Sequence, residues 1–387
     1  ILYNNIKKLI GAEIPDQEIR SIILALGITS DTESAEGMEL LVPPYKVDVT
    51  RECDITEEVL RIYGYNNIQI PSKVNASLSN SIRPDKENTQ HTVADMLSSN
   101  GFSEIWCNSL TRASYVIDES KVVEILNPLS SDLGIMRQSL LHPALESVAY
   151  NQNRKNADLK FYEFGKIYNL DNGEYKESLR LLLIISGNKQ AEQWNQNAKP
   201  VDFYDLKAAV DGLIGRLGIS GLQAEKIEGN GFGYGIKYFR GDKDIVRLGS
   251  VAETDKKRTG VEREVFYADI DWDAVLKIVS KNKIKNKEVP KFPSVRRDLS
   301  MLVDKSVTFD SLKSIAFKTD RKLVKDVKIF DVFEGGGKTA LPEGKKSYAL
   351  NFTLQNEEQT LTDKQIDAVM QKIIHNLAQE VNAEIRK

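Results

Sequence analysis

The sequence predicts a multidomain α+β protein, for three reasons. At 387 residues the chain is longer than one typical hydrophobic core requires, so two to four domains are expected. The hydrophobic periodicity changes from short helical patterns to apolar strands mixed with a few helices. Two polar stretches, 71–85 and 277–297, interrupt these patterns and are typical of linkers. We therefore predict domains over residues 1–72, 86–280 and 290–387.

The first domain is predicted to be a winged-helix-like module. Apolar residues recur at helical spacing over 2–10 and again over 16–26, where Pro15 precedes the second helix and Gly27 ends it. The stretch MELLVPPYKVDV, residues 38–49, predicts a strand that two prolines interrupt. A third helix is expected in DITEEVLRIY, so two helices, a strand hairpin and a helix make up the module.

The second domain is predicted to be an antiparallel sheet with a few helices. Strand patterns occur in DLKFYEFGKIYNL, RLLLIISG, IVRLGSVA and VFYADIDW, and helices are expected over 91–100 and in DFYDLKAAVDGLIGRLG. Glycines alternate from Gly229 to Gly235 in GNGFGYGIKYF, which predicts a strand that another group approaches closely. This spacing is not G-x-G-x-x-G and no G-K-[ST] follows it, so a phosphate-binding loop is not expected.

The third domain is predicted to have the ferredoxin-like plan. The order is strand (294–303), helix (309–318), strand (323–333), strand (346–355), helix (363–379) and a short final strand. This β-α-β-β-α-β order is typical of a sheet with two helices on one face.

The charge is unevenly distributed, although its net value is only −3. Residues 1–70 hold 6 Lys/Arg against 12 Asp/Glu, whereas residues 290–387 hold 17 against 14, which suggests different partners for the two ends. The two cysteines, Cys53 and Cys107, exclude a disulfide framework and fit a reducing cytoplasm. No apolar run approaches the ~20 residues that a membrane span requires, so no membrane partner is expected. Because the chain does not begin with Met, we expect a fragment or a processed product.

The sequence shows no complete catalytic site. The three histidines, His91, His142 and His375, have no Ser or Cys beside them in a nucleophile motif, and we expect them at the surface or at domain boundaries. We therefore predict no catalytic residue in this chain. A binding protein, a scaffold or a noncatalytic subunit is the expected class.

Four carboxylates stand close together in DVTRECDITEE, namely Asp48, Asp54, Glu57 and Glu58. Asp54 and Glu57 have the spacing of a capping box, with Asp54 as the N-cap residue of the third helix. The alternative is a site for a hard cation, Mg²⁺ or Ca²⁺, because such ions prefer oxygen ligands. Spacing alone favours the capping interpretation and leaves the metal site open.

Several stretches resemble the beta subunits of bacterial phenylalanine–tRNA ligases. PPYKVDVTRECDITEEVLRIYGYNNIQIP resembles a signature in which P-x-[RK]-x-D-[IV], D-[IL]-x-E-E-[VI] and R-x-Y-G-Y-[ND] recur. ILNPLSSDLGIMRQSLL and NQNRKNADLKFYEFGKIY are similar to the catalytic-like domain of that family. KFPSVRRDLSMLV and GKKSYALNFTLQNEEQTLTD are similar to its C-terminal ferredoxin-fold anticodon-binding domain. The resemblance follows the family order across nearly the whole chain.

This resemblance implies a part of a class II aminoacyl-tRNA synthetase. The family forms cytoplasmic α2β2 tetramers that use ATP to activate phenylalanine and attach it to tRNA(Phe), and the alpha subunit binds ATP and performs the chemistry. The class II-like core of the beta subunit lacks an active site and serves as interface and scaffold. Family Mg²⁺ ligands, shared with the alpha subunit, match Asp48, Asp54, Glu57 and Glu58, which favours the metal interpretation. The oligonucleotide-binding-fold and editing domains of the family are absent from this sequence, so hydrolysis of mischarged tRNA is not expected.

Anticodon binding is expected on the open face of the ferredoxin-like sheet. Bases of a single-stranded loop can stack on aromatic side chains there while basic side chains contact phosphates. Alternate strand residues must face the helices, so about half of the candidates are expected to be wrong. The candidates are Arg296, Arg297, Phe330, Phe333, Lys345, Lys346 and Tyr348.

Two other function classes compete with this interpretation. A free-standing nucleic-acid-binding protein could use its winged-helix head to read DNA, but the acidic head argues against it because DNA readers are basic at the contact. A hydrolase or kinase with a carboxylate metal site ranks last, because the sequence lacks a phosphate loop, a nucleophile and a base.

Overall fold

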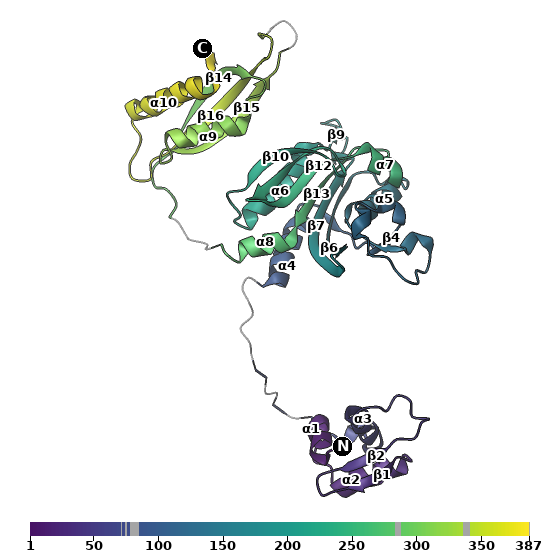
Figure 1. Ribbon diagram of the computed structural model, residues 1–387. Coiled ribbons are helices and arrows are strands. Elements are labelled where there is room, and N and C mark those ends of the chain that lie inside the picture. The colour runs from purple at the N-terminus through teal and green to yellow at the C-terminus, as the bar shows by residue number, and fades with distance from the viewer. Residues whose placement is uncertain (71, 74–75, 78–84, 283–287, 336–340, 387) are drawn as a thin grey trace. The chain divides into compact units, whose positions relative to one another are not determined.

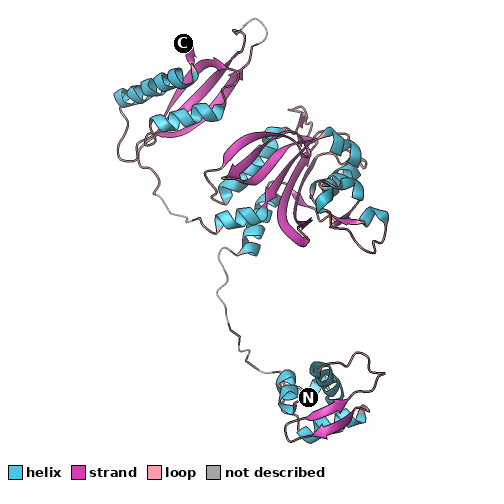
Figure 2. Cartoon of the chain, viewed as in Figure 1, coloured by secondary structure: helices cyan, strands magenta, loops and turns pink. Residues whose placement is uncertain are grey.

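The computed structural model describes residues 1–70, 72–73, 76–77, 85–282, 288–335 and 341–386 (Figure 1). The chain divides into two compact units, Ile1–Asn88 and Thr89–Lys387, and the second unit contains two separate large sheets (Figure 2). Helices and mainly antiparallel strands confirm the predicted α+β class. Within the described ranges, no helix is both long and apolar enough to cross a membrane. The predicted domain boundaries stay predictions.

The N-terminal unit consists of three helices and a two-stranded antiparallel sheet around an isoleucine-rich core. Its elements are α1 (Tyr3–Ile10), α2 (Asp16–Ala25), β1 (Thr29–Glu33), β2 (Met38–Leu41) and α3 (Glu52–Tyr63), followed by the 3₁₀ turn η1 (Tyr65–Asn67). The strand expected over 38–49 ends at Leu41, because the two prolines that follow have no N–H to donate to a ladder. The name winged helix for this arrangement stays a prediction.

The largest sheet has seven strands in the order β10-β11-β12-β13-β7-β6-β3, and only the β3–β6 pair is parallel. The strands are β3 (Ser103–Glu104), β6 (Leu159–Asp171), β7 (Glu174–Ser186), β10 (Gln223–Gly229), β11 (Phe232–Arg240), β12 (Lys243–Val251) and β13 (Val265–Asp271). Short pairs are β4 (Leu110–Thr111) with β5 (Ile135–Met136) and β8 (Asn188–Gln190) with β9 (Lys199–Pro200). Single 3₁₀ turns are η2 (Ala113–Tyr115), η3 (Glu119–Lys121) and η4 (Ser131–Leu133).

Helices cover both faces of this sheet, and we call the sheet with its five helices the sheet domain. One face packs against α4 (Lys86–Ser99), α6 (Phe203–Arg216) and α8 (Trp272–Val279), and the other packs against α5 (Leu141–Gln152), with α7 (Glu253–Thr259) beside α5. Alternate residues of β7 therefore enter two different cores: Leu181 and Leu183 enter the first, and Leu182 and Ile184 enter the second. This double burial explains the uninterrupted apolar run LLLII, residues 181–185.

The alternating glycines have two separate functions. Gly235 of β11 pairs with Gly249 of β12, and a Cβ on Gly235 would lie 2.3 Å from the Leu248 carbonyl oxygen. The predicted close approach is therefore confirmed at Gly235. Gly229 and Gly231 instead form the β10–β11 turn with φ of +79° and +88°, a region that glycine adopts without strain.

The C-terminal domain has the predicted ferredoxin-like plan. Its four antiparallel strands stand in the order β15-β16-β14-β17, and both helices pack on one face. The elements are β14 (Val295–Asp304), α9 (Phe309–Thr319), β15 (Val324–Phe333), β16 (Lys345–Leu354), α10 (Asp363–Val381) and β17 (Glu384–Arg386). Met301 and Phe352 from the sheet meet Leu312 of α9 and Ile373 of α10 in the core.

Candidate functional site

The acidic stretch of the sequence forms the start of α3. The helix begins at Glu52, so the prediction that Asp54 is its N-cap residue is wrong. Asp54 is the third helical residue, and its Oδ2 accepts hydrogen bonds from the backbone N–H groups of Thr50 (3.0 Å) and Arg51 (2.7 Å). Asp54 thus occupies the third helical position that the capping-box spacing predicts for Glu57, and the box lies one turn closer to the N-terminus.

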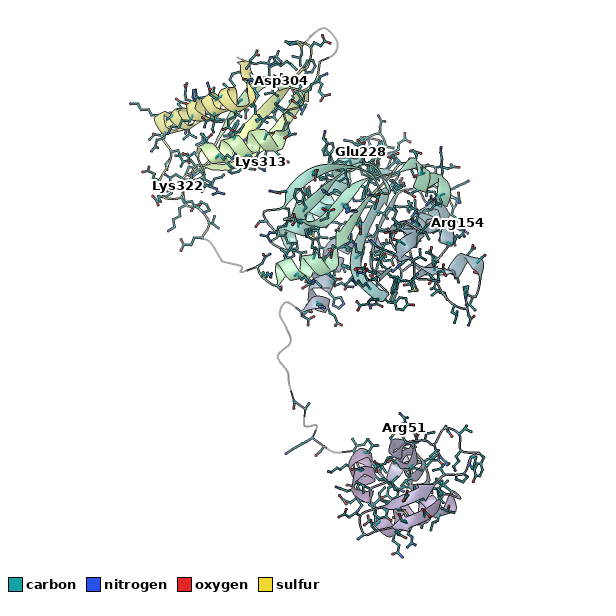
Figure 3. All side chains as sticks on the ribbon, viewed as in Figure 1. Arg51, Arg154, Glu228, Asp304, Lys313 and Lys322 are labelled. Atoms are coloured by element: carbon teal, nitrogen blue, oxygen red, sulfur yellow. The ribbon has the colours of Figure 1, made fainter. Side chains whose placement is uncertain are left out.

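Basic side chains of the same unit already neutralise two of the four carboxylates. Arg51, at the start of α3 (Figure 3), places its Nη2 3.0 Å from Asp54 Oδ1 and holds the pKa of that carboxyl well below its usual range. Glu58 lies 2.9 Å from Lys46 Nζ and 3.2 Å from Arg61 Nη2, and these two cations lower its pKa. Asp48 and Glu57 are exposed.

The donor chemistry of this stretch fits a magnesium ion, but its arrangement supplies only part of a site. Carboxylate oxygens are the ligands that Mg²⁺ prefers. In the residues that the structure describes, no three His, Cys, Asp or Glu side chains are grouped closely enough to hold an ion. A magnesium ion bound here would complete its coordination with water or with groups of a second molecule, and the four-residue ligand set stays a prediction.

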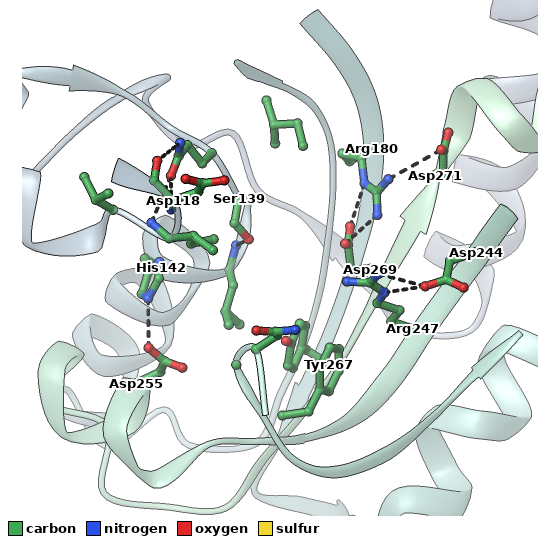
Figure 4. A pocket seen from close by; sticks show the side chains of 18 of the residues that line it. Asp118, Ser139, His142, Arg180, Asp244, Arg247, Asp255, Tyr267, Asp269 and Asp271 are labelled. Atoms are coloured by element: carbon green, nitrogen blue, oxygen red, sulfur yellow. Dashed lines mark hydrogen bonds and ion pairs between the residues drawn. The ribbon is translucent and has the colours of Figure 1, made fainter. Parts of the chain in front are cut away.

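A pocket of about 1140 Å³ opens on the face of the seven-stranded sheet that carries α5 (Figure 4). Strands β7, β12 and β13 supply Arg180, Arg247 and Asp269, and the start of α5 supplies His142. A large concave site on an antiparallel sheet, lined by titratable groups, is the natural first candidate for ligand binding.

All four cationic side chains that line this pocket are already paired. Each lies within 4 Å of a carboxylate, and the pocket wall holds six acidic residues against these four cations. A triphosphate is bound through cations that are free to contact it, and breaking a pre-existing ion pair adds a cost. The pocket is therefore poorly suited to ATP. The pairs are Lys121–Asp118 (3.3 Å), Arg180–Asp269 (2.5 Å), Arg247–Asp244 (2.7 Å) and Arg258–Asp255 (3.8 Å).

His142 connects two helices at the edge of the pocket. The expectation of a surface or boundary histidine is wrong, because His142 is only 5% exposed within α5. Its Nε2 lies 3.0 Å from Asp255 Oδ1 on α7, and its ring stacks on Tyr115 with centroids 4.6 Å apart. The bond to His142 lowers the pKa of Asp255, and burial raises the pKa of Tyr115 to about 12. This contact could not be predicted from local sequence, because 113 residues separate the two partners.

A buried ion pair that the sequence analysis also missed lies beneath β6. Arg137 Nη1 donates to Glu163 Oε1 at 2.7 Å, and the two residues are 3% and 0% exposed. Arg137 also donates to the carbonyl oxygens of Cys107 (3.1 Å) and Lys166 (2.9 Å). One guanidinium thus joins three chain segments. Burial raises the pKa of the neighbouring Cys107 thiol to about 12, so that thiol is not a reactive thiolate.

Four of the predicted RNA-binding residues are placed where solvent can reach them. Arg296, Phe333 and Lys345 lie on the sheet face away from the helices, as their strand register shows, and Phe330 is 58% exposed at an irregularity in β15. Arg296 Nε donates to Asn351 Oδ1 at 3.1 Å. The ammonium group of Lys345 lies between two carboxylates, 3.5 Å from Asp304 and 3.3 Å from Glu384.

The other three candidates lie on the helix-covered side, so their prediction as open-face residues is wrong. Tyr348 is 7% exposed in the core, and its hydroxyl donates to the Val307 carbonyl oxygen at 3.4 Å. Lys346 is buried with its ammonium 4.7 Å from the centre of the Tyr348 ring. Arg297 has the same strand parity and pairs with Asp363 at 3.5 Å. Successive side chains of a strand point to opposite faces of the sheet, and this alternation places all three side chains on the helix-covered side.

Three family profiles match consecutive parts of the chain. A tRNA synthetase B5 domain matches residues 1–65, and a phenylalanyl tRNA synthetase beta chain CLM domain matches residues 70–272. A ferredoxin-fold anticodon binding domain matches residues 290–386.

Curated relatives extend this match over the whole chain. The phenylalanine–tRNA ligase beta subunit of Bacteroides thetaiotaomicron is 43% identical over 99% of this chain and 49% of its own length. The beta subunit of Bacteroides fragilis is 42% identical, and the match covers 100% of this chain and 49% of that protein's own length. The chain spans about half the length of these relatives. Among solved structures, pyrrolysyl-tRNA synthetase from Desulfitobacterium hafniense covers 51% of this chain and 70% of its own, with a TM-score of 0.40 and 13% identity.

Proposed function

This chain belongs to the phenylalanyl-tRNA synthetase beta chain family, and from this premise we propose that it is the scaffold and tRNA-holding part of a phenylalanine–tRNA ligase. In this proposal the complete cytoplasmic enzyme is an α2β2 tetramer that attaches phenylalanine to tRNA(Phe). The alpha subunit binds ATP and performs the chemistry. This chain supplies a subunit interface, magnesium ligands and an anticodon-binding domain.

One observation carries the noncatalytic role: the large sheet pocket has no unpaired cation in the described part of its wall. Stabilising the transferring phosphates of ATP requires cations or Mg²⁺ aimed at the charge that develops. Here Arg180 and Arg247 bind aspartates of the same sheet instead, which stabilises the domain as a scaffold. The alternative, a free-standing DNA reader, is not favoured, because the N-terminal unit that would contact DNA is acidic.

For the metal we propose that Asp48, Asp54, Glu57 and Glu58 hold Mg²⁺ together with groups of the alpha subunit. Four carboxylates on one unit carry one more charge than the three cations beside them, Lys46, Arg51 and Arg61, neutralise. A shared divalent cation would compensate the remainder and link the two subunits. For the anticodon we propose that Phe330 and Phe333 stack on bases while Arg296 and Lys345 contact phosphates.

Subunit association tests the scaffold role directly. The purified chain is mixed with a separately expressed phenylalanine–tRNA ligase alpha chain and analysed by size-exclusion chromatography. We expect co-elution. A chain that stays separate and binds duplex DNA tightly would instead favour the free-standing nucleic-acid reader.

The ligand set is tested by the Mg²⁺ dependence of that association. Glu58→Gln should raise the Mg²⁺ concentration required for half-maximal assembly, because it removes a ligand charge. Glu36→Gln is the matched control in the same unit, since no side-chain contact of Glu36 is described. An identical Mg²⁺ dependence in both variants would remove Glu58 from the ligand set.

A further inference from the structure

A second cavity of the sheet domain, of about 490 Å³, lies between the β11–β12 turn and α8. Figure 1 labels β12 and α8, which contribute to its lining. We call it the basic cavity, because Arg240, Lys243, Lys277 and Lys281 line it and no acidic residue is among its described lining residues. Arg240 ends β11, Lys243 begins β12, Lys277 is in the last turn of α8 and Lys281 follows that helix. Four positive charges thus converge from the β11–β12 hairpin and from the C-terminal end of α8.

Most of these charges have no carboxylate partner. Lys243 Nζ lies 3.3 Å from Asp271, whereas Arg240, Lys277 and Lys281 have no carboxylate within 4.0 Å among the residues described. The C-terminus of α8 attracts Lys277 and Lys281 through the helix dipole. This attraction does not account for Arg240, which belongs to a strand. The basic cavity is therefore the electrostatic opposite of the sheet-face pocket, in which every cation is paired.

Between the cations the cavity has an apolar wall. The partly buried Ile278 forms this part of the lining, with the buried core residues Ile245 and Ala274 beneath it. The volume lies within the ~300–1000 Å³ typical of small-ligand sites. Cations bind phosphate by charge-assisted hydrogen bonds, and an apolar wall accepts the flat face of a base. We propose that the basic cavity binds a nucleoside phosphate, either a free nucleotide or one nucleotide of an RNA strand. This inference does not depend on the proposed function.

Isothermal titration of the full chain tests the proposal with four probes: AMP, adenosine, inorganic phosphate and a single-stranded oligoribonucleotide of adenosines. The variant Arg240→Gln/Lys277→Gln removes two cations of the cavity. Arg263→Gln/Lys226→Gln is the matched control, because it removes one Arg and one Lys that lie in the same domain but outside the cavity. Thermal unfolding of both variants verifies that they remain folded.

We expect AMP or the oligonucleotide to bind at least about tenfold more weakly to the cavity variant than to the wild type or the control, since two charge-assisted contacts are lost. Tight binding of AMP assigns the cavity to free nucleotides, and binding of the oligonucleotide alone assigns it to RNA. The proposal is overturned if neither probe binds, if the cavity variant binds them as the wild type does, or if inorganic phosphate binds as tightly as AMP.

Discussion

At the scale of single residues, Arg137 is a buried charged side chain in the sheet domain that needs a buried partner of opposite charge. Its guanidinium is buried against Glu163, and Glu163 Oε2 is buried without a hydrogen-bond partner. A buried ion pair is not by itself strongly stabilising, but removing one partner leaves an uncompensated buried charge. The stability of this domain therefore depends on keeping both partners or replacing both.

Replacing Arg137 alone tests this dependence. Arg137→Met should lower the free energy of unfolding by about 3–5 kcal/mol, because Glu163 would remain buried and charged. Trp272 of α8 is fully buried in the sheet domain, whereas Trp106 and Trp194 are exposed, so a change of tryptophan fluorescence during urea unfolding reports mainly on Trp272. The double variant Arg137→Met/Glu163→Leu should recover the part of the loss that comes from the unpaired charge, whereas the carbonyl oxygens of Cys107 and Lys166 still lose their donor. A single variant as stable as the wild type would contradict the prediction.

The carboxylates at the start of α3 predict acid sensitivity of the N-terminal unit. Asp54 and Glu58 have folded-state pKa values below their ordinary values of 3.8 and 4.5. Their stabilising contribution is therefore complete above the unfolded pKa values and is lost as the pH falls through the lower, folded values. We expect the amide NMR signals of α3 to lose their native positions as the pH falls below 4.5.

Variants of the same two residues provide the comparison. Asp54→Asn/Glu58→Gln should be less stable at neutral pH and should change less between neutral and acidic pH, because its groups do not titrate. Glu36→Gln should retain the wild-type profile. Parallel profiles in the wild type and the double variant would assign the acid sensitivity to other groups.

At the scale of elements, two neighbouring strands can pair only where their backbones come close enough for hydrogen bonding. The β11–β12 pair depends on Gly235 facing Gly249, since any side chain at Gly235 would meet the neighbouring backbone. By contrast, Gly215 in α6 has open space around its hypothetical Cβ. The same substitution should therefore have opposite effects in the two elements.

Gly235→Ala should reduce the unfolding free energy of the sheet domain by about 1–3 kcal/mol, the usual cost of overpacking. Gly215→Ala should increase it by roughly 0.5–1 kcal/mol, because alanine favours the helix and loses less backbone entropy. The unfolding free energies of both variants are measured by tryptophan fluorescence during urea unfolding. A neutral Gly235→Ala variant would show that the two strands can separate without cost.

At the scale of the whole molecule, negative and positive charges are concentrated in different parts of the chain. The N-terminal unit is acidic, the sheet-face pocket is neutralised internally, and unpaired cations occur in the basic cavity. This distribution agrees with the noncatalytic role that we propose for the chain.

The chain alone is accordingly expected to be inactive in amino-acid activation. With ATP and phenylalanine it should give no pyrophosphate exchange above buffer, because the pocket offers paired cations only. A complete phenylalanine–tRNA ligase serves as the positive control. Exchange by the isolated chain would contradict the division of labour proposed between this chain and the alpha subunit.

Local sequence signals alone determined much of this protein: the α+β class, the β-α-β-β-α-β order of the C-terminal domain and the helix that contains most of the acidic stretch. Hydrophobic periodicity, glycines and helix-start residues act over a few positions, so they can be read along the chain. Family membership also followed from motifs in the sequence.

Only the tertiary structure decided which charges are free. His142 and Asp255 are 113 residues apart, and Arg137 and Glu163 are 26 apart, so no local pattern announces either contact. Likewise, strand parity relative to the helices removed Tyr348 from the open face and kept Arg296 on it. The physical reason is that desolvation and ion pairing depend on three-dimensional neighbours, whereas residue type and spacing describe only neighbours along the chain.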